Sequence, residues 1–192
     1  MGKKLNKYKE GKIMSKKVLL AGESWMSNTT HTKGFDSFFT GVYETGETRL
    51  VEALEASGYD VTFLPNHLAG EKFPFSLEEL KEYDCIILSD IGANTLLLPA
   101  VTFSKSVKMP NRTKVIRDYV LDGGSLLMIG GYLTFSGVDA KGKWHDTAVQ
   151  DVLPVEILTV DDRMEHCEGV KPVTIKEHKA LQGVGSDWPE VL

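Results

Sequence analysis

Residues 17–22 read Lys-Val-Leu-Leu-Ala-Gly, a short apolar run that ends in glycine. Such a run is typical of a strand that is buried on both faces of a parallel sheet. Similar runs follow along the chain: DVTFL at 60–64, YDCIIL at 83–88 and SLLMI at 125–129. We therefore predict four strands at these segments, with the one at 17–22 first.

Segments with helical periodicity or capping patterns separate these strands. We expect helices at 47–57, which stops at Gly58, at 76–82, which opens on the capping box Ser-Leu-Glu-Glu, and at 111–121, which stops before Gly123-Gly124. Strands that alternate with helices favour an α/β fold with a mainly parallel sheet and right-handed crossovers. A short helix at 146–152 and strands at 155–160 and 171–176 complete the prediction.

Composition limits the classes of protein and partner. A chain of 192 residues with 42% hydrophobic residues can form one domain, which we place at 16–192. We expect the lysine-rich residues 1–15 to be a disordered extension. Met14, near its end, could be the natural start of translation. A net charge of −5 argues against nucleic acid as a partner, and no apolar run is long enough for a membrane span. Cys85 and Cys167 form no CxxC pair, which fits a reducing cytoplasm.

The residues just after each predicted strand are the first candidates for a site, because ligands of open parallel sheets bind beyond the carboxyl ends of the strands. A long polar and aromatic segment, expected to be a loop, follows the first strand from Glu23 to Tyr43. The candidate ligand-binding residues are Glu23, Ser24, Trp25, His31, Asp90, Asn94, Gly131, Tyr132 and Trp144. A small-molecule ligand is the expected partner, with no cofactor and no metal, since no GxGxxG or metal-ligand spacing is present.

Each candidate also has an ordinary structural explanation. Glu23, Asp90 and His145 could act as general acids or bases, but carboxylates and turn formers at strand ends often cap loops and helices. Trp25 and Trp144 could stack on a sugar ring or fill the protein interior. His31 and His145 have no spacing that links them to one metal or proton.

The turn at Gly130-Gly131 has the small residues of a nucleophile elbow without a nucleophile. Tyr132 is the nearest candidate, and a phenol with an ordinary pKa near 10 is a poor one. The sequence of this turn therefore does not predict covalent catalysis.

Several unusual stretches of the sequence, taken together, resemble those of a known protein family. They are AGESWMSNTTHTKGFDSFFTGVYETG at 21–46, LSDIGANTLLLP at 88–99, GGSLLMIGGYLTFSG at 123–137, DVLPVEIL at 151–158 and HKALQGV at 178–184. In this order they resemble the Putative glutamine amidotransferase family of bacterial cytoplasmic proteins, over residues 14–192.

The resemblance implies a class I glutamine amidotransferase-like fold, which is a flavodoxin-like three-layer α/β/α architecture. It implies kinship with trehalose-utilisation-type proteins and with the trimerisation domain of some β-galactosidases. Gly131 stands where true amidotransferases carry the catalytic Cys, so we expect no glutaminase activity from that thiol, and His178 with Glu177 would have no nucleophile to activate. Family members usually continue beyond Trp188, so the chain is expected to end early and to leave an exposed sheet edge.

Three functions remain open from the sequence. The first is binding of a small polar ligand, plausibly a carbohydrate, between Glu23–Tyr43 and Gly131–His145. The second is a hydrolase or lyase that works without a thiol and uses Glu23, Asp90 or His145. The third is a structural module that forms a homo-oligomer through the aromatic segment after the first strand.

Overall fold

The computed structural model describes residues 15–191, so the predicted extension lies, apart from Ser15, outside the described residues. The chain divides into two compact units, Met1–Asp162 and Arg163–Leu192.

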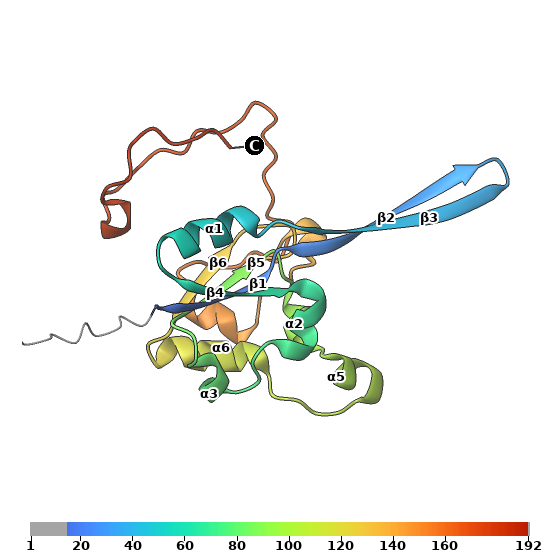
Figure 1. The fold of residues 1–192 in the computed structure, drawn as a ribbon, viewed down its shortest axis with the longest axis horizontal. Helices are drawn as coiled ribbons and strands as arrows, with labels where there is room; N and C mark the ends of the chain where they lie inside the picture. Colours follow the sequence, from blue (N-terminus) through green and yellow to red (C-terminus); the bar gives the residue numbers. More distant parts are fainter. Residues whose placement is uncertain (1–14, 192) are drawn as a thin grey trace, which may run out of the picture. The chain divides into compact units, whose positions relative to one another are not determined.

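The first unit is built on a sheet of parallel strands in the order β4-β1-β5-β6 (Figure 1). These strands are β1 (Lys17–Gly22), β4 (Asp60–Pro65), β5 (Cys85–Ser89) and β6 (Ser125–Ile129). Gly22 lies opposite both Pro65 and Ser89, and Ser89 lies opposite Ile129. The carboxyl ends of all four strands therefore meet at one edge of the sheet, as the sequence predicted.

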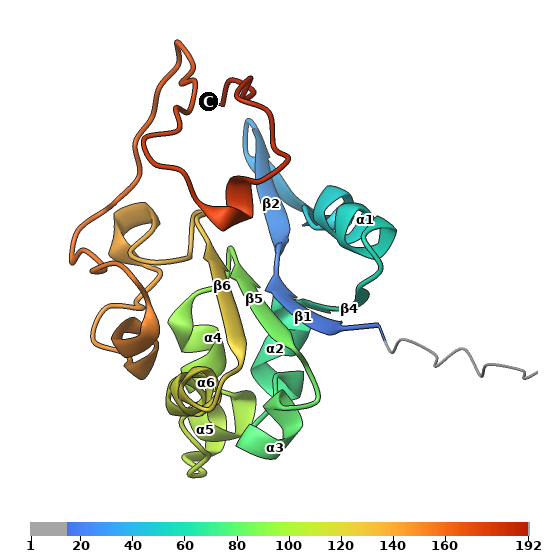
Figure 2. The same cartoon turned by 90° about the vertical axis from the view of Figure 1, so that its left-hand side faces the viewer.

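Helices cover both faces of this sheet, which confirms the α/β class (Figure 2). On one face α1 packs Leu50, Val51 and Leu54 against Val18, Leu20 and Ile87. The larger core lies on the other face and includes buried residues of the helices at 66–72, 77–80, 93–97 and 112–121. The helices are α1 (Thr48–Ala56), α2 (Asn66–Lys72), α3 (Leu77–Leu80), α4 (Ala93–Leu97), α5 (Ala100–Lys105) and α6 (Arg112–Leu121), with 3₁₀ turns η1 (Val138–Ala140), η2 (Ala148–Val152) and, in the second unit, η3 (Lys179–Leu181).

Two predicted helix starts have the expected caps. Ser76 accepts a hydrogen bond from the Glu79 N–H, and the Glu79 carboxylate accepts from the Ser76 N–H in return, which completes the capping box of α3. Asn111 accepts hydrogen bonds from the N–H groups of Thr113 and Lys114 at the start of α6. Local side-chain chemistry thus fixes where both helices begin.

The segment after β1 is a long β-hairpin and not the loop that the sequence analysis expected. Strand β2 (Ser24–Lys33) pairs antiparallel with β3 (Asp36–Thr45) in full register, from Ser24 opposite Thr45 to Lys33 opposite Asp36. Gly34 has φ +64° at the first position of the two-residue turn, as a type II′ hairpin requires. The signal missed was this Gly-Phe pair between two runs rich in Thr, Phe, Tyr and Val.

Other expectations were also wrong. Residues 155–160 and 171–176 form no strand, because Ile157 is the one buried residue of the first segment and both segments lack a neighbouring strand to pair with. The expected helix at 146–152 is the shorter 3₁₀ turn η2. β6 is an edge strand and leaves Leu127 47% exposed, where a buried strand was predicted.

Candidate functional site

Glu23 and Asp90 are the first residues after two adjacent strands, β1 and β5. Both have φ +45°, a left-handed backbone conformation that is unusual for residues other than glycine. The Glu23 N–H donates to the Ser89 carbonyl at 3.0 Å, and the Ser89 hydroxyl donates to the Glu23 carboxylate. Strained backbone of this kind is frequent at ligand-binding sites.

Asn66, which directly follows β4, forms hydrogen bonds with Ser24 and Asp90 after β1 and β5. Its backbone N–H donates to the Ser24 hydroxyl at 2.8 Å, and its side-chain amide donates to the carbonyls of Ser24 at 2.8 Å and of Asp90 at 2.9 Å. Sequence reasoning missed Asn66, although it directly follows a predicted strand. It could have been found by applying the strand-end rule to every strand.

The turn after β6 closes the other side of this strand-end crevice. The Leu133 N–H donates to the Asp90 carboxylate at 2.9 Å, and the Asp90 N–H donates to the Thr134 hydroxyl at 3.2 Å. A Cβ on Gly131 would lie only 3.1 Å from the Asp90 Cβ, so glycine permits the close approach of these two turns. Glu23, Ser24, Asp90 and Gly131 are therefore brought together by the ends of three strands.

Four other candidates lie elsewhere. Trp144 is fully buried and its indole N–H donates to the Ile91 carbonyl at 2.8 Å, so it fills the core and cannot contact a ligand, contrary to the ligand-binding prediction. His31 lies eight residues along β2 from Glu23, about 26 Å at strand geometry, where its ring stacks on Phe38. Asn94 is exposed in the first turn of α4, and Tyr132 is 61% exposed.

His145 belongs to a different pocket in the first unit. This pocket has a volume of about 280 Å³, and Lys143, Asp146 and Thr159 also line it. The His145 Nδ1 lies 3.0 Å from the carboxylate of Asp146, its neighbour in sequence. The structure therefore does not join His145 to Glu23 and Asp90.

An apolar pocket of about 600 Å³ lies at the base of the hairpin. Trp25, Met26, Tyr43 and His67 line it, and the Tyr43 ring meets the His67 ring of α2 edge-on at 5.2 Å. Ser24 and Asn66 complete the lining, so this pocket adjoins the strand-end crevice.

Cys85 does not lie at the carboxyl ends of the strands. Cys85 is the first residue of β5, at the opposite end of that strand from Asp90, and burial, reinforced by the charge of Asp84, raises the pKa of its thiol. Cys167 is exposed in the second unit. A thiol with a raised pKa is a poor nucleophile, because the thiolate is the reactive form.

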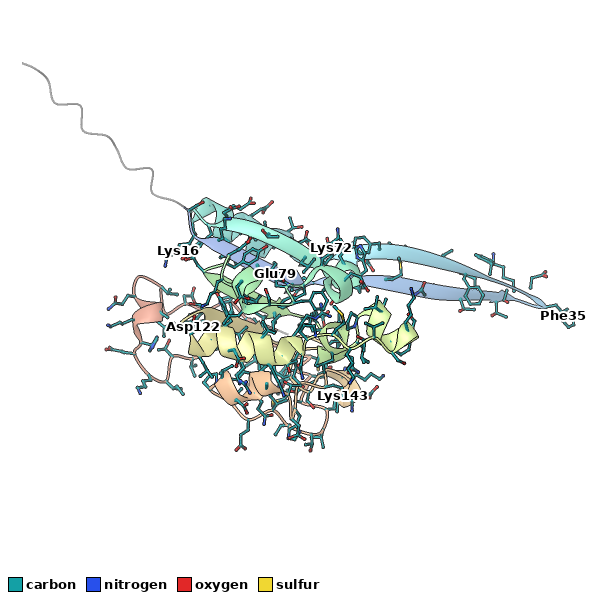
Figure 3. The ribbon with its side chains drawn as sticks, turned by 90° about the horizontal axis from the view of Figure 1, so that it is seen from below. Lys16, Phe35, Lys72, Glu79, Asp122 and Lys143 are labelled. Atoms are coloured by element: carbon teal, nitrogen blue, oxygen red, sulfur yellow. The ribbon has the colours of Figure 1, made fainter. Side chains whose placement is uncertain are left out.

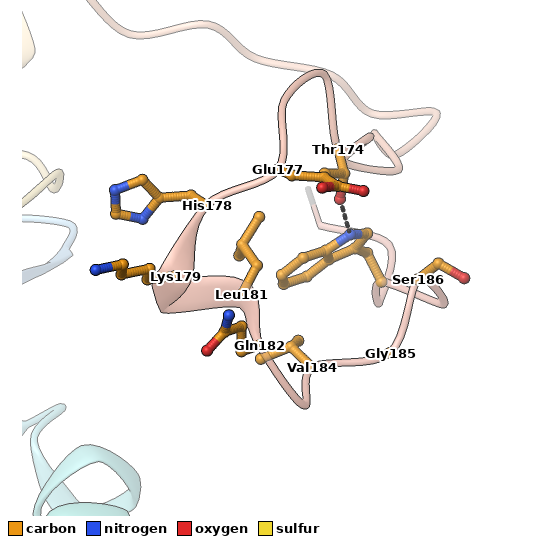
Figure 4. A pocket seen from close by; sticks show the side chains of 10 residues that line it. Thr174, Glu177, His178, Lys179, Leu181, Gln182, Val184, Gly185 and Ser186 are labelled. Carbon is orange, nitrogen blue, oxygen red and sulfur yellow. Dashed lines mark hydrogen bonds between the residues drawn. The ribbon is translucent and has the colours of Figure 1, made fainter.

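The second unit has a pocket of its own, of about 510 Å³ (Figure 4). Glu177, His178 and Trp188 line it, and the Trp188 indole N–H donates to the Thr174 hydroxyl at 3.2 Å. The His178 ring accepts a hydrogen bond from the Ala180 N–H and so caps η3. This role explains His178 without catalysis.

Two further findings concern residues 15–191. Among them, no group of three or more His, Cys, Asp or Glu side chains is arranged to hold a metal ion. Within the same range, no helix is long and apolar enough to cross a membrane.

Comparison with known proteins places the chain in a family. The family model described as "Putative glutamine amidotransferase", of the GATase1-like type, matches residues 17–192. The chain belongs to this family. A search of the curated proteins found no match.

Two solved structures resemble this member of the GATase1-like family closely. They are described as "Cytoplasmic Protein STM3548 from Salmonella typhimurium" and "Cytoplasmic Protein STM1381 from Salmonella typhimurium LT2". The first is 43% identical, with a TM-score of 0.87 over 91% of this chain and 71% of that chain. The second is 45% identical, with a TM-score of 0.87 over 92% of this chain and 72% of that chain.

Proposed function

We propose that this GATase1-like protein binds a small polar ligand, with a sugar or sugar acid as the expected class, in the strand-end crevice. The observation that carries this proposal is the pair of carboxylate residues, Glu23 and Asp90, held in left-handed conformations after β1 and β5. The sheet order β4-β1-β5-β6 makes the gap between β1 and β5 the switch point, because the chain leaves β1 for β4 on one side and reaches β5 on the other. Ligands of open α/β sheets bind at such switch points.

The polar groups at this point suit a ligand that carries hydroxyl groups. Carboxylates accept hydrogen bonds from hydroxyls, and the Ser24 and Ser89 hydroxyls can both donate and accept. Strain at Glu23 and Asp90 costs on the order of 1–3 kcal/mol for each residue. The protein is expected to work in the cytoplasm, as the descriptions of its two Salmonella neighbours suggest.

A ligand panel tests the proposal. We expect one or more monosaccharides or sugar acids to raise the melting temperature, because a ligand at 100 times its Kd stabilises the folded state by about 2.7 kcal/mol. Glu23→Gln and Asp90→Asn should abolish the shift while they keep most hydrogen bonds of the turns. Glu55→Gln, at an exposed position on α1, is the matched control and should keep it. A panel without any shift, or a shift that survives both crevice variants, contradicts the proposal.

Catalysis by the same carboxylates is the second candidate function. The two acidic residues that the sequence singled out follow adjacent strands, and a carboxylic acid paired with a carboxylate can act as general acid and base without a thiol. If the ligand that raises the melting temperature is a substrate, the native chain should convert it in a product assay. A ligand that is bound and left unchanged contradicts this second candidate. Hydrolysis of glutamine is not expected, because Gly131 supplies no nucleophile and Cys85 lies at the far end of β5.

A further inference from the structure

The β2–β3 hairpin is the most exposed apolar element of the first unit. All ten residues of β3 are exposed, and in β2 Ser24 alone is buried. Figure 3 shows the hairpin extending away from the sheet, with Phe35 at its tip. Its exposed aromatic and apolar side chains are Trp25, Met26, Phe35, Phe38, Phe39, Val42 and Tyr43.

The hairpin does not pack its apolar side chains into the core of the first unit. None of its residues belongs to either core cluster, and an isolated two-stranded hairpin is marginally stable in water. Its five aromatic side chains expose on the order of 600 Å² in total, against the roughly 800 Å² that each partner buries in a stable interface. The strand register divides this area, because Trp25 and Phe38 lie on one face of the hairpin and Phe39 and Tyr43 on the other. Exposed apolar surface concentrated on one element favours an interaction site.

The two ends of the hairpin complement each other. The tip presents Phe35 without cover, at 110% relative exposure, and the base holds the apolar pocket of about 600 Å³ lined by Trp25, Met26 and Tyr43. Phe35 is eight residues from Tyr43 along β3, about 27 Å, so it cannot reach the pocket of its own chain. A second copy of the chain has the same exposed Phe35 and the same pocket, so each copy can offer a pocket to the other's Phe35.

We propose that two copies of this chain form a two-fold dimer in which the hairpins lie antiparallel and each Phe35 enters the pocket at the base of the other hairpin. This arrangement uses each tip and each pocket once, so the contact closes and does not propagate into a fibre. Each Phe35 would also border the strand-end crevice, since Ser24 and Asn66 line the pocket.

Sedimentation velocity of the full chain tests the dimer. Protein concentrations from about 1 μM to about 1 mM detect dimer Kd values in the same range. We expect a dimer for the native sequence and a dimer Kd raised at least about tenfold by Phe35→Ser, as for a central aromatic contact. Phe103→Ser on α5 is the matched control, because Phe103 is 78% exposed and lies outside the hairpin. A native chain that stays monomeric over this range, or equal effects of the two substitutions, overturns the proposal.

Cross-linking tests the geometry independently of affinity. In a Cys167→Ser background, chains with Phe35→Cys mixed with chains carrying His67→Cys should form a mixed disulfide dimer under mild oxidation. Phe103→Cys mixed with His67→Cys should not. Absence of the Phe35–His67 disulfide in a sample that sediments as a dimer overturns the proposed arrangement. Ligand binding is read separately by melting temperature, so failure of one proposal does not imply failure of the other.

Discussion

At the scale of the residue, Arg112 shows how one side chain joins several elements. It is the first residue of α6 and is completely buried, and its guanidinium donates to carbonyls at the ends of α2 and α4. The acceptors are the carbonyls of Ala69, Gly70, Phe73, Thr95 and Leu96. Most of these carbonyls lie in the last turn of a helix, where backbone donors run out, although the Ala69 carbonyl also accepts the Phe73 N–H. Arg112 thus provides the hydrogen bonds that C-caps would provide at the ends of both helices.

Arg112 remains charged despite its burial. Desolvation, opposed by the nearby charge of Glu71, lowers the pKa of Arg112 to about 10, which is still well above neutral pH. Its guanidinium also lies over the Phe75 ring at 4.4 Å, a favourable cation–π contact. No sequence pattern indicates this role, because an arginine next to a helix cap has the same local pattern whether it is buried or exposed.

Replacement of Arg112 should therefore be costly. We expect Arg112→Met to lower the free energy of unfolding by about 3 kcal/mol or more, since it leaves several buried carbonyls without donors. Arg117→Met is the matched control on the same helix: Arg117 is partly exposed and pairs with Asp118, so the loss should be below about 1 kcal/mol. Urea unfolding measures both values. Similar losses for the two variants would show that the carbonyl contacts of Arg112 contribute little.

At the scale of the element, the junction between α6 and β6 depends on close packing against a glycine. The Tyr119 hydroxyl donates to the Tyr83 carbonyl at 2.9 Å, and the Tyr119 ring lies across Gly124. A Cβ on Gly124 would lie 2.2 Å from the ring, well inside contact distance. The glycine pair that the sequence marked as a helix stop thus also makes room for an aromatic side chain from the helix.

Gly124→Ala should displace the Tyr119 ring and cost about 2 kcal/mol of the free energy of unfolding, as overpacking of a core does. Gly130→Ala is the matched control after the next strand, because a Cβ there meets no atom within 4 Å and Gly130 does not need a positive φ. Thermal or urea unfolding of both variants provides the comparison. Equal stability of the two would mean that the ring moves aside without loss.

At the scale of the whole molecule, the first unit holds the buried core. The buried hydrophobic residues run from Val18 to Ile157, within the first unit. The last residues of this unit still matter, because the Asp162 carboxylate accepts the N–H groups of Ser136 and Gly137 at 2.9 and 2.7 Å. Asp161 accepts the Asp139 N–H at 2.8 Å in the same way.

A chain that ends after Asp162 should therefore fold. We expect it to unfold cooperatively, with a melting temperature within about 4 °C of the full chain, a difference of roughly 1 kcal/mol. A chain that ends after Val160 is the control and should be less stable than the Asp162 truncation, because it lacks the carboxylates that hold 136–139. Calorimetry distinguishes the two. Loss of cooperative unfolding in the longer truncation would show that the first unit depends on residues 163–192.

The sequence by itself determined the parallel sheet, the family and three helices, predicted at 47–57, 76–82 and 111–121 and found at 48–56, 77–80 and 112–121. These features depend on local patterns, namely apolar runs, caps and helix-stopping glycines, which act over a few residues. The strand-end rule likewise predicted that Glu23, Ser24, Asp90 and Gly131 lie at one edge, because parallel strands end together.

Tertiary structure alone decided which side chains are buried, which backbone groups they contact and that residues 24–45 form a hairpin. Trp144 and His145 are adjacent in sequence, yet one fills the core and the other lines a separate pocket, since burial depends on which distant residues pack around each side chain. Asn66 and Arg112 act through backbone groups far from them in the chain, and no sequence pattern marks a backbone carbonyl as needing a donor. The hairpin was hidden because its strands bury almost nothing within one chain, so they lack the alternation of apolar and polar residues by which a half-buried strand is predicted.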